Sequence, residues 1–163
     1  MIARHAAGNV PISKINENWT AFAQKIGFNI LNPKNDYVAK TIHETTGGKG
    51  ADVVFEVLGS QPGVDLMTAV AATHGRMVMV AIHAAKPQID MFQFFWRELD
   101  LIGARVYRPE DYDKSIALLA KGVVDCDAFT TDIQGLSDIQ SAFETLTQNP
   151  NAMKSMIRVR EAM

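Results

Sequence analysis

Cysteine is nearly absent from this 163-residue chain, which contains only Cys126. A single thiol excludes an internal disulfide and any zinc site built from several cysteines. No apolar run approaches the roughly 18 to 20 residues that cross a bilayer, and the opening residues lack the apolar core and cleavage site of a signal peptide. We therefore expect a protein of the cytoplasm, where thiols remain reduced.

An excess of one charge is also lacking. The chain has 16 Lys and Arg against 18 Asp and Glu, a net charge of −2, with the two signs interspersed. No basic surface for nucleic acid or for an anionic membrane follows from this balance. The hydrophobic fraction of 47% is sufficient for a core, and the length predicts one domain over residues 1–163.

Strand-like and helix-like segments alternate along the chain. Residues 53–55 and 77–80 are continuously apolar, which is typical of parallel strands with helices on both faces. The predicted strands are residues 10–13, 52–58, 77–82 and 99–106. This alternation predicts an α/β fold with a doubly wound parallel sheet.

The predicted helices have recognisable ends. One ends near residues 74–75, and another begins at the acidic segment 109–111 and stops at residues 121–122. The second helix should bury a stripe formed by Tyr112, Ile116 and Leu119. In such sheets ligands bind beyond the carboxyl ends of the strands. The candidate site residues are therefore Ser13, Lys14, Leu58, Gly59, Ala81, Ile82, Arg105 and Val106.

Four segments, residues 47–59, 75–80, 92–99 and 102–107, together resemble the nucleotide-binding half of zinc-type medium-chain dehydrogenases. The last two are similar to the butanediol, sorbitol and threonine dehydrogenase branch, and the resemblance continues to about Val159. It implies a Rossmann-type sheet, NAD or NADP as cofactor, and an oxidoreductase that transfers a hydride between a secondary alcohol and nicotinamide.

Two parts of that family's pattern are missing here. The family's domain begins with a strand and a G-x-G-x-x-G turn, which this sequence does not contain. The zinc-binding catalytic domain is also missing, so zinc is expected only in that missing domain. The resemblance thus implies a partial cofactor-binding domain that carries no catalytic residue or metal ligand and is not expected to turn over substrate alone. The alternative is a non-catalytic nucleotide-binding or subunit-association module.

The resemblance also implies roles for the strand ends. Leu58 and Gly59 would face the adenosine half of the cofactor, although Gly59 could instead serve only the geometry of its turn. Ala81 and Ile82 would hold the nicotinamide end, mainly through backbone groups, together with the pair Arg105 and Val106. Arg105 has an equal alternative as a surface charge at a strand end.

Lys14 stands where the family's pattern has an acidic side chain that binds the adenosine ribose and selects NAD. Two interpretations remain open. Ser13 and Lys14 could bind the 2′-phosphate of NADP, or the site has decayed and Lys14 is a solvated surface residue. Pro11 supports the second interpretation, because it removes a hydrogen-bond donor from a strand that should be internal.

Other residues have both a functional and a structural interpretation. Glu56, in an apolar strand, could act as an acid or base, but neighbouring backbone groups more often satisfy such a carboxylate. His83 follows a strand end and could touch a ligand, and no histidine has a partner at metal-binding spacing. The cluster Phe92, Phe94, Phe95 and Trp96 either packs into the core or marks an interface.

The missing first strand leads to a testable prediction. In a doubly wound sheet that strand lies at the centre, so its absence leaves residues 10–13 and 52–58 each with an unpaired edge. We expect the chain alone to be marginally stable, or to fill the gap by rearrangement or with another chain, as in a homo-oligomer joined through the sheet edge. Thermal melting combined with a size measurement tests this expectation, and a cooperative melt of a monomer at ordinary temperature would contradict it.

Overall fold

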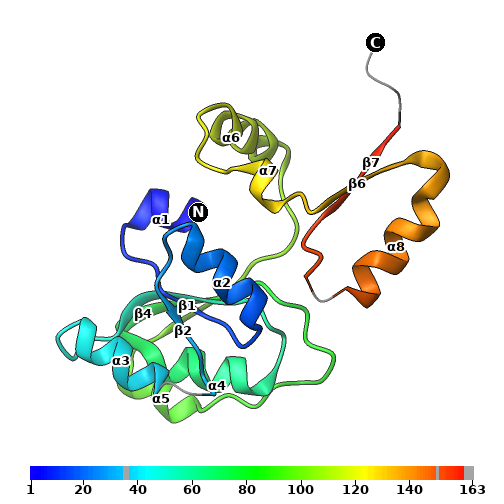
Figure 1. Ribbon diagram of the computed structural model, residues 1–163. Helices are drawn as coiled ribbons and strands as arrows, with labels where there is room; N and C mark the ends of the chain where they lie inside the picture. The colour runs from blue at the N-terminus through cyan, green and yellow to red at the C-terminus, as the bar shows by residue number, and fades with distance from the viewer. Residues whose placement is uncertain (35–36, 150, 160–163) are drawn as a thin grey trace. The chain divides into compact units, whose positions relative to one another are not determined.

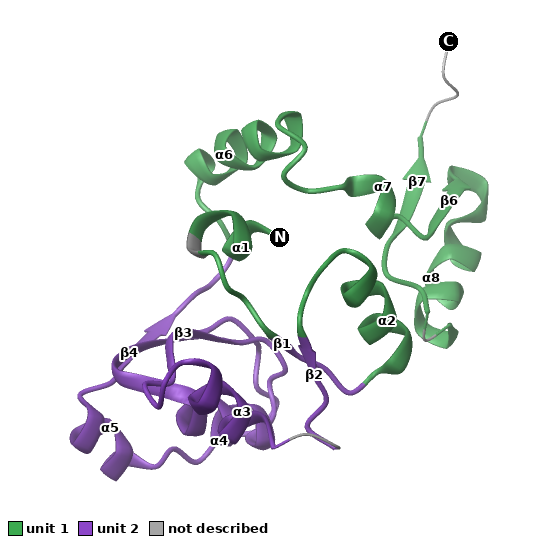
Figure 2. Cartoon of the chain, turned by 60° about the vertical axis from the view of Figure 1, so that its left-hand side comes forward, with its two compact units in different colours: residues 1–11, 16–29, 107–163 green, residues 12–15, 30–106 purple. Residues whose placement is uncertain are grey.

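A computed structural model of the chain describes residues 1–34, 37–149 and 151–159. The chain divides into two compact units, which Figure 2 shows in different colours. The first comprises Met1–Pro11, Asn16–Asn29 and Tyr107–Met163, and the second comprises Ile12–Ile15 and Ile30–Val106. All eight candidate site residues belong to the second unit.

The strands of the second unit form two parallel sheets. In one, β1 (Ile12–Ser13) pairs with β2 (Ile30–Leu31). In the other, β3 (Ala51–Glu56), β4 (Ala71–Met79) and β5 (Asp100–Gly103) lie in that order. Every pairing is parallel, so the predicted α/β fold with a parallel sheet is confirmed.

The break between the two sheets lies where the sequence lacks a strand. Within the described ranges, β1 pairs only with β2, and β3 pairs only with β4. A doubly wound sheet in the order 3-2-1-4-5-6 places its first strand between the second and the fourth. With β1 as the second strand and β3 as the fourth, the observed pairing is that order without its first member.

Three helices of the second unit build its core: α3 (Val38–Thr45), α4 (Gln61–Val70) and α5 (Met91–Arg97), all visible in Figure 1. One cluster joins Val64 and Met67 of α4 to Met77 of β4, which is completely buried. It also includes Ala71 and Leu99. A second cluster consists of Leu31, Val38, Ile42 and Val70. These contacts pack α4 against β4 and α3 against α4.

Within the described residues of the second unit, the helices pack on one face of β3. Val54 packs against both clusters, whereas Val53 and Phe55, which point to the other face, are 43% and 53% exposed. The expectation of burial on both faces is therefore wrong for this strand. A further difference is that α4 ends at Val70 and β4 begins directly at Ala71, several residues earlier than predicted.

The first unit contains shorter elements. Its helices are α1 (Ile2–Ala7), α2 (Glu17–Lys25), α6 (Pro109–Ala120), α7 (Cys126–Phe129), the 3₁₀ helix η1 (Leu136–Asp138) and α8 (Ile139–Gln148). Strand β6 (Asp132–Gly135) pairs in parallel with β7 (Ser155–Arg158). The Arg4 guanidinium lies 4.3 Å from the Phe28 ring centroid and donates to the carbonyls of Ile26 and Gly27. It thereby ties α1 to the end of α2.

Helix α6 has the predicted extent but not the predicted burial. Tyr112, Ile116 and Leu119 are 56%, 62% and 44% exposed, so the expected buried stripe is wrong. Tyr112 instead makes an edge-to-face contact with Tyr107, at 5.1 Å between ring centroids. In the described part of the chain, no helix has the length and apolar character needed to cross a membrane.

Candidate functional site

The ends of β3 and β4 lie side by side. The Glu56 carbonyl accepts hydrogen bonds from the amides of Val80 and Ala81, at 2.9 and 3.2 Å. Beyond the strands, a Cβ added to Gly59 would lie 2.5 Å from the carbonyl oxygen of Ile82 and 3.5 Å from the Ala81 side chain. The structure thus brings together two of the four predicted segments, residues 58–59 and residues 81–82.

Glycine at position 59 is required by the turn itself. Its φ of 69° lies in the left-handed region, where residues with a Cβ are strained. The carbonyl of Ile82 occupies the space where that Cβ would be. Glycine is thus needed for the geometry of the turn, which is one of the two interpretations of Gly59. The other, that Gly59 faces a cofactor, is compatible with this geometry.

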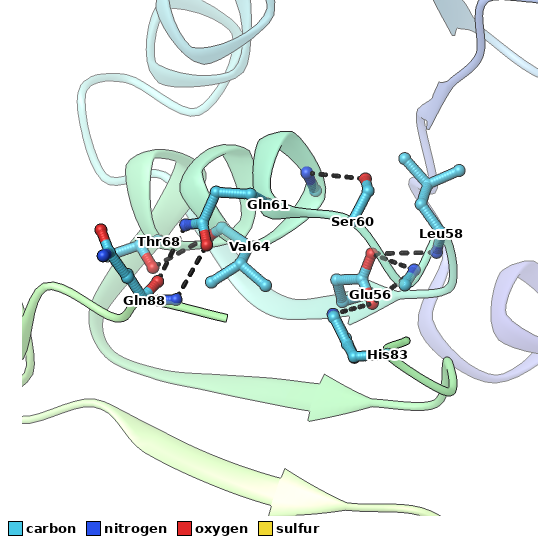
Figure 3. A network of polar contacts seen from close by, with 10 residues as sticks. Glu56, Leu58, Ser60, Gln61, Val64, Thr68, His83 and Gln88 are labelled. Carbon is cyan, nitrogen blue, oxygen red and sulfur yellow. Dashed lines mark hydrogen bonds and ion pairs between the residues drawn. The ribbon is translucent and has the colours of Figure 1, made fainter. Parts of the chain in front are cut away.

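A buried carboxylate supports this turn. The Glu56 side chain is 1% exposed, and its Oε1 accepts hydrogen bonds from the amides of Leu58 and Gly59, at 2.9 and 3.1 Å (Figure 3). Of the two interpretations of Glu56, the structure shows the one in which neighbouring backbone groups satisfy the carboxylate. Its charge is therefore used to hold the chain that follows β3.

His83 contacts the same carboxylate. Its Nε2 lies 3.5 Å from Glu56 Oε2, and its side chain is 11% exposed. Apart from that contact, Nε2 has no hydrogen-bond partner in the described part of the chain. The sequence points to Glu56 and His83 separately but not as a pair. The signal that could have joined them is their common place at the carboxyl ends of consecutive parallel strands.

The other two predicted segments also follow strand ends. The Ala104 amide donates to the Met79 carbonyl at 2.9 Å, which places Arg105 and Val106 just beyond the end of β5 beside β4. The Lys14 amide donates to the Leu31 carbonyl at 3.1 Å and so extends the β1–β2 pairing past Ser13. The side chains of Ser13 and Lys14 are half-buried.

Large apolar side chains are exposed at three of these strand ends. Ile82 is 96% exposed and Val106 is 68% exposed. After β3, Val57 and Leu58 are 63% and 55% exposed. We name Val57, Leu58, Ile82 and Val106 the apolar rim. Exposed apolar groups at the edge of a sheet where ligands bind are able to contact a ligand or another protein.

The aromatic cluster of α5 is partly in the core and partly exposed, so each of the two predicted interpretations, core packing and an interface, applies to some of its members. Phe94 packs against the core cluster around Met77. In contrast, Phe92, Phe95 and Trp96 are 62%, 77% and 69% exposed, and the rings of Phe92 and Trp96 stack with centroids 6.0 Å apart. One member therefore belongs to the core and the other three form an exposed aromatic face.

The described residues do not form a zinc site. No group of three or more His, Cys, Asp or Glu side chains in that part of the chain is arranged to hold a metal ion. His43 contacts the carbonyls of Gly48 and Ala69, His74 lies 3.5 Å from Glu98, and Cys126 is exposed. These side chains therefore do not fit the metal that the resemblance implies for the family.

The parallel sheets with α3, α4 and α5 packed on them define a Rossmann-type α/β domain. Residues 1–121 match the family described as zinc-binding dehydrogenase, and the chain belongs to that family. The predicted resemblance is thereby confirmed. Membership implies a nicotinamide dinucleotide and zinc as the cofactors of the family.

Proteins similar in sequence to this chain include a sugar-acid dehydrogenase and a polyol-phosphate dehydrogenase. The chain is 44% identical over 156 residues to a 2-dehydro-3-deoxy-L-galactonate 5-dehydrogenase of Pseudoalteromonas atlantica, covering 96% of this chain and 46% of that protein. It is 30% identical over 139 residues to a D-arabitol-phosphate dehydrogenase of Enterococcus avium, covering 84% and 39%. This chain therefore spans less than half the length of either relative.

A solved structure agrees with these matches. The crystal structure of 2R,3R-butanediol dehydrogenase from Bacillus subtilis superposes with a TM-score of 0.88 at 25% identity, covering 97% of this chain and 46% of that one. The similarity includes nearly the whole chain, so the fold of the family extends through both compact units.

The geometry at Gly59 makes a prediction about stability. We expect Gly59→Ala to lower the free energy of unfolding by more than the ~1–2 kcal/mol typical of a left-handed non-glycine residue, because its Cβ would also overlap the Ile82 carbonyl. Unfolding in denaturant, followed by circular dichroism, measures the change.

Two further glycines provide matched controls for this measurement. Gly48 has a φ of 86° and open space around its Cβ position, so Gly48→Ala introduces backbone strain without a steric overlap. Gly103→Ala introduces neither. The expected order of destabilisation is Gly59, then Gly48, then Gly103. Equal losses at Gly59 and Gly48 would contradict the overlap.

Proposed function

We propose that this chain binds and orients a nicotinamide dinucleotide at the carboxyl ends of β1, β3, β4 and β5. The observation that carries the proposal is the apolar rim, which lies beyond the strands of a parallel sheet in a zinc-binding dehydrogenase. Ligands of doubly wound sheets bind at this edge. Burying an exposed apolar side chain such as Ile82 against a flat ring of the ligand gives a favourable free energy.

Each segment has a part in this proposal. The turn at Leu58 and Gly59 faces the adenosine half of the dinucleotide, and residues 81–82 and 105–106 hold the nicotinamide end. The bound dinucleotide supplies hydride transfer to or from a secondary alcohol. The contribution of this chain is to bind the cofactor and to present one face of its ring.

The proposed substrates are alcohols with several hydroxyl groups. This class is supported by the names of the relatives, which refer to 2-dehydro-3-deoxy-L-galactonate and to D-arabitol phosphate. Zinc is assigned to the catalytic domain of the family, since the described residues of this chain offer no suitable cluster. The single cysteine supports a cytoplasmic location.

A second candidate function is subunit association. It is favoured by the exposed aromatic face of Phe92, Phe95 and Trp96 and by the strand edges of β1 and β3, which are unpaired within the described residues. Such edges are able to pair with another chain, which supports a homo-oligomer joined through the sheet edge. Size measurement with and without the dinucleotide separates this module from a cofactor-binding one.

Cofactor binding at the rim is testable with Ile82. We expect the chain to bind a reduced nicotinamide dinucleotide, and Ile82→Ser to weaken that binding by about tenfold, because covering a large apolar side chain contributes roughly 1.5–3 kcal/mol. At 96% exposure, Ile82 contributes little to folding. A titration that follows cofactor fluorescence gives the dissociation constants.

Ile116→Ser is the matched control, since Ile116 is 62% exposed and lies on α6 of the other unit. It should bind the dinucleotide like the unaltered chain. Equal affinities of the Ile82 and Ile116 variants for the dinucleotide would show that the apolar rim is not part of the binding site.

For nucleotide preference, the proposed ligand of Ser13 and Lys14 is the 2′-phosphate of NADP. Lys14 is half-buried at the end of β1, and its backbone is fixed by the bond to Leu31. A lysine held there supplies a positive charge at the position where a carboxylate would select NAD.

This assignment predicts tighter binding of NADPH than of NADH. We expect Lys14→Ala to lose roughly tenfold in NADPH affinity, the scale of one charge-assisted hydrogen bond, with little change for NADH. Lys40→Ala is the control, because Lys40 pairs with Glu44 on the surface of α3. Tighter binding of NADH by the unaltered chain would refute the phosphate contact.

A further inference from the structure

The Glu56 carboxylate joins parts of the chain that are distant in sequence. Glu56 is the last residue of β3. Its carboxylate accepts hydrogen bonds from the amides of Leu58 and Gly59, and its Oε2 lies 3.5 Å from His83 Nε2. Figure 3 shows these contacts converging on one side chain. The turn after β3 is therefore hydrogen-bonded to the same carboxylate that His83, in the segment after β4, approaches.

The start of α4 encloses this carboxylate. A Cβ at Gly63, in the first turn of the helix, would overlap Glu56 Oε1. The positive end of the helix dipole favours a negative charge at that place. Ser60 caps α4 and directly follows the turn, so the first turn of the helix packs against the carboxylate.

A second contact holds the far end of the segment after β4. Gln61 Nε2 donates to the Gln88 carbonyl at 2.9 Å, and the Gln88 amide donates to Gln61 Oε1 at 2.8 Å. Beyond Ala81, whose amide donates to the Glu56 carbonyl, the stretch to Gln88 makes two further contacts, at His83 and at Gln88. Of these two, only the contact at His83 lies next to the predicted cofactor segment 81–82.

We propose that Glu56 is a positioning residue of the cofactor site, which sets the placement of the turn 57–59 relative to the segment 80–83 through its contact with His83. The inference rests on the proposed function, because both segments are assigned to the dinucleotide. Glu56 does not touch the cofactor. It acts through the backbone of Leu58 and Gly59 on one side and through His83 on the other.

The test uses three substitutions in the full chain. Glu56→Gln keeps the shape and an oxygen that can accept from Leu58 and Gly59, but removes the charge that faces His83. His83→Ala removes the partner and leaves the carboxylate bonds to the turn intact. Glu44→Gln is the matched control, because Glu44 is an exposed residue of α3 whose partner is Lys40.

Two measurements are made on variants that circular dichroism shows to be folded. The first is the dissociation constant of NADH and of NADPH. The second is amide hydrogen exchange at Leu58 and Gly59 without cofactor, which reports local opening of the turn. We expect Glu56→Gln and His83→Ala each to weaken binding by about tenfold, a typical coupling between sites, and the double variant to lose little more than either one.

Exchange at Leu58 and Gly59 should accelerate in His83→Ala even though that variant keeps both turn bonds. Folded Glu56→Gln and His83→Ala variants with the affinity and exchange of the unaltered chain would overturn the inference and leave the proposed function standing. If the unaltered chain binds neither dinucleotide, the proposed function fails. Faster exchange in His83→Ala would then still support the coupling between the two segments, and unchanged exchange would overturn it.

Discussion

The parallel alignment of β3, β4 and β5 is the constraint on which the rest of the structure depends. Because the three strands run in one direction, the residues that follow them emerge at one edge of the sheet. Packing of Val64 and Met67 against Met77 fixes α4 on this sheet. The carboxylate of Glu56 then determines how the chain leaves β3, and the backbone of Ile82 determines which residue can occupy position 59.

Much of this arrangement could be predicted from the sequence. Apolar runs near residues 53–55 and 77–80 correctly indicated the parallel strands β3 and β4, and the lack of a glycine fingerprint anticipated the break between β1 and β3. These features are encoded locally, by the types and order of neighbouring residues. Family membership followed from the order and spacing of four segments rather than from any single motif.

The remainder depends on contacts between distant residues. Composition does not show that Glu56 meets His83, because that pairing arises from the register of β3 with β4. The strands β2, β6 and β7 have only two to four residues each and carry too short a pattern to be recognised. Helix α6 has the apolar spacing of a helix with one buried face, but Ile116 on that face is exposed. The sequence could not predict this, because amphipathic spacing does not specify what covers the apolar face.

The positions around the strand ends are subject to two different degrees of structural constraint. At Gly59 the fold alone dictates the residue, because any side chain would collide with the neighbouring backbone whether or not a ligand is bound. At Ile82 the fold imposes almost nothing, since the side chain extends into solvent. A substitution at Ile82 therefore leaves intact the architecture that Gly59 maintains.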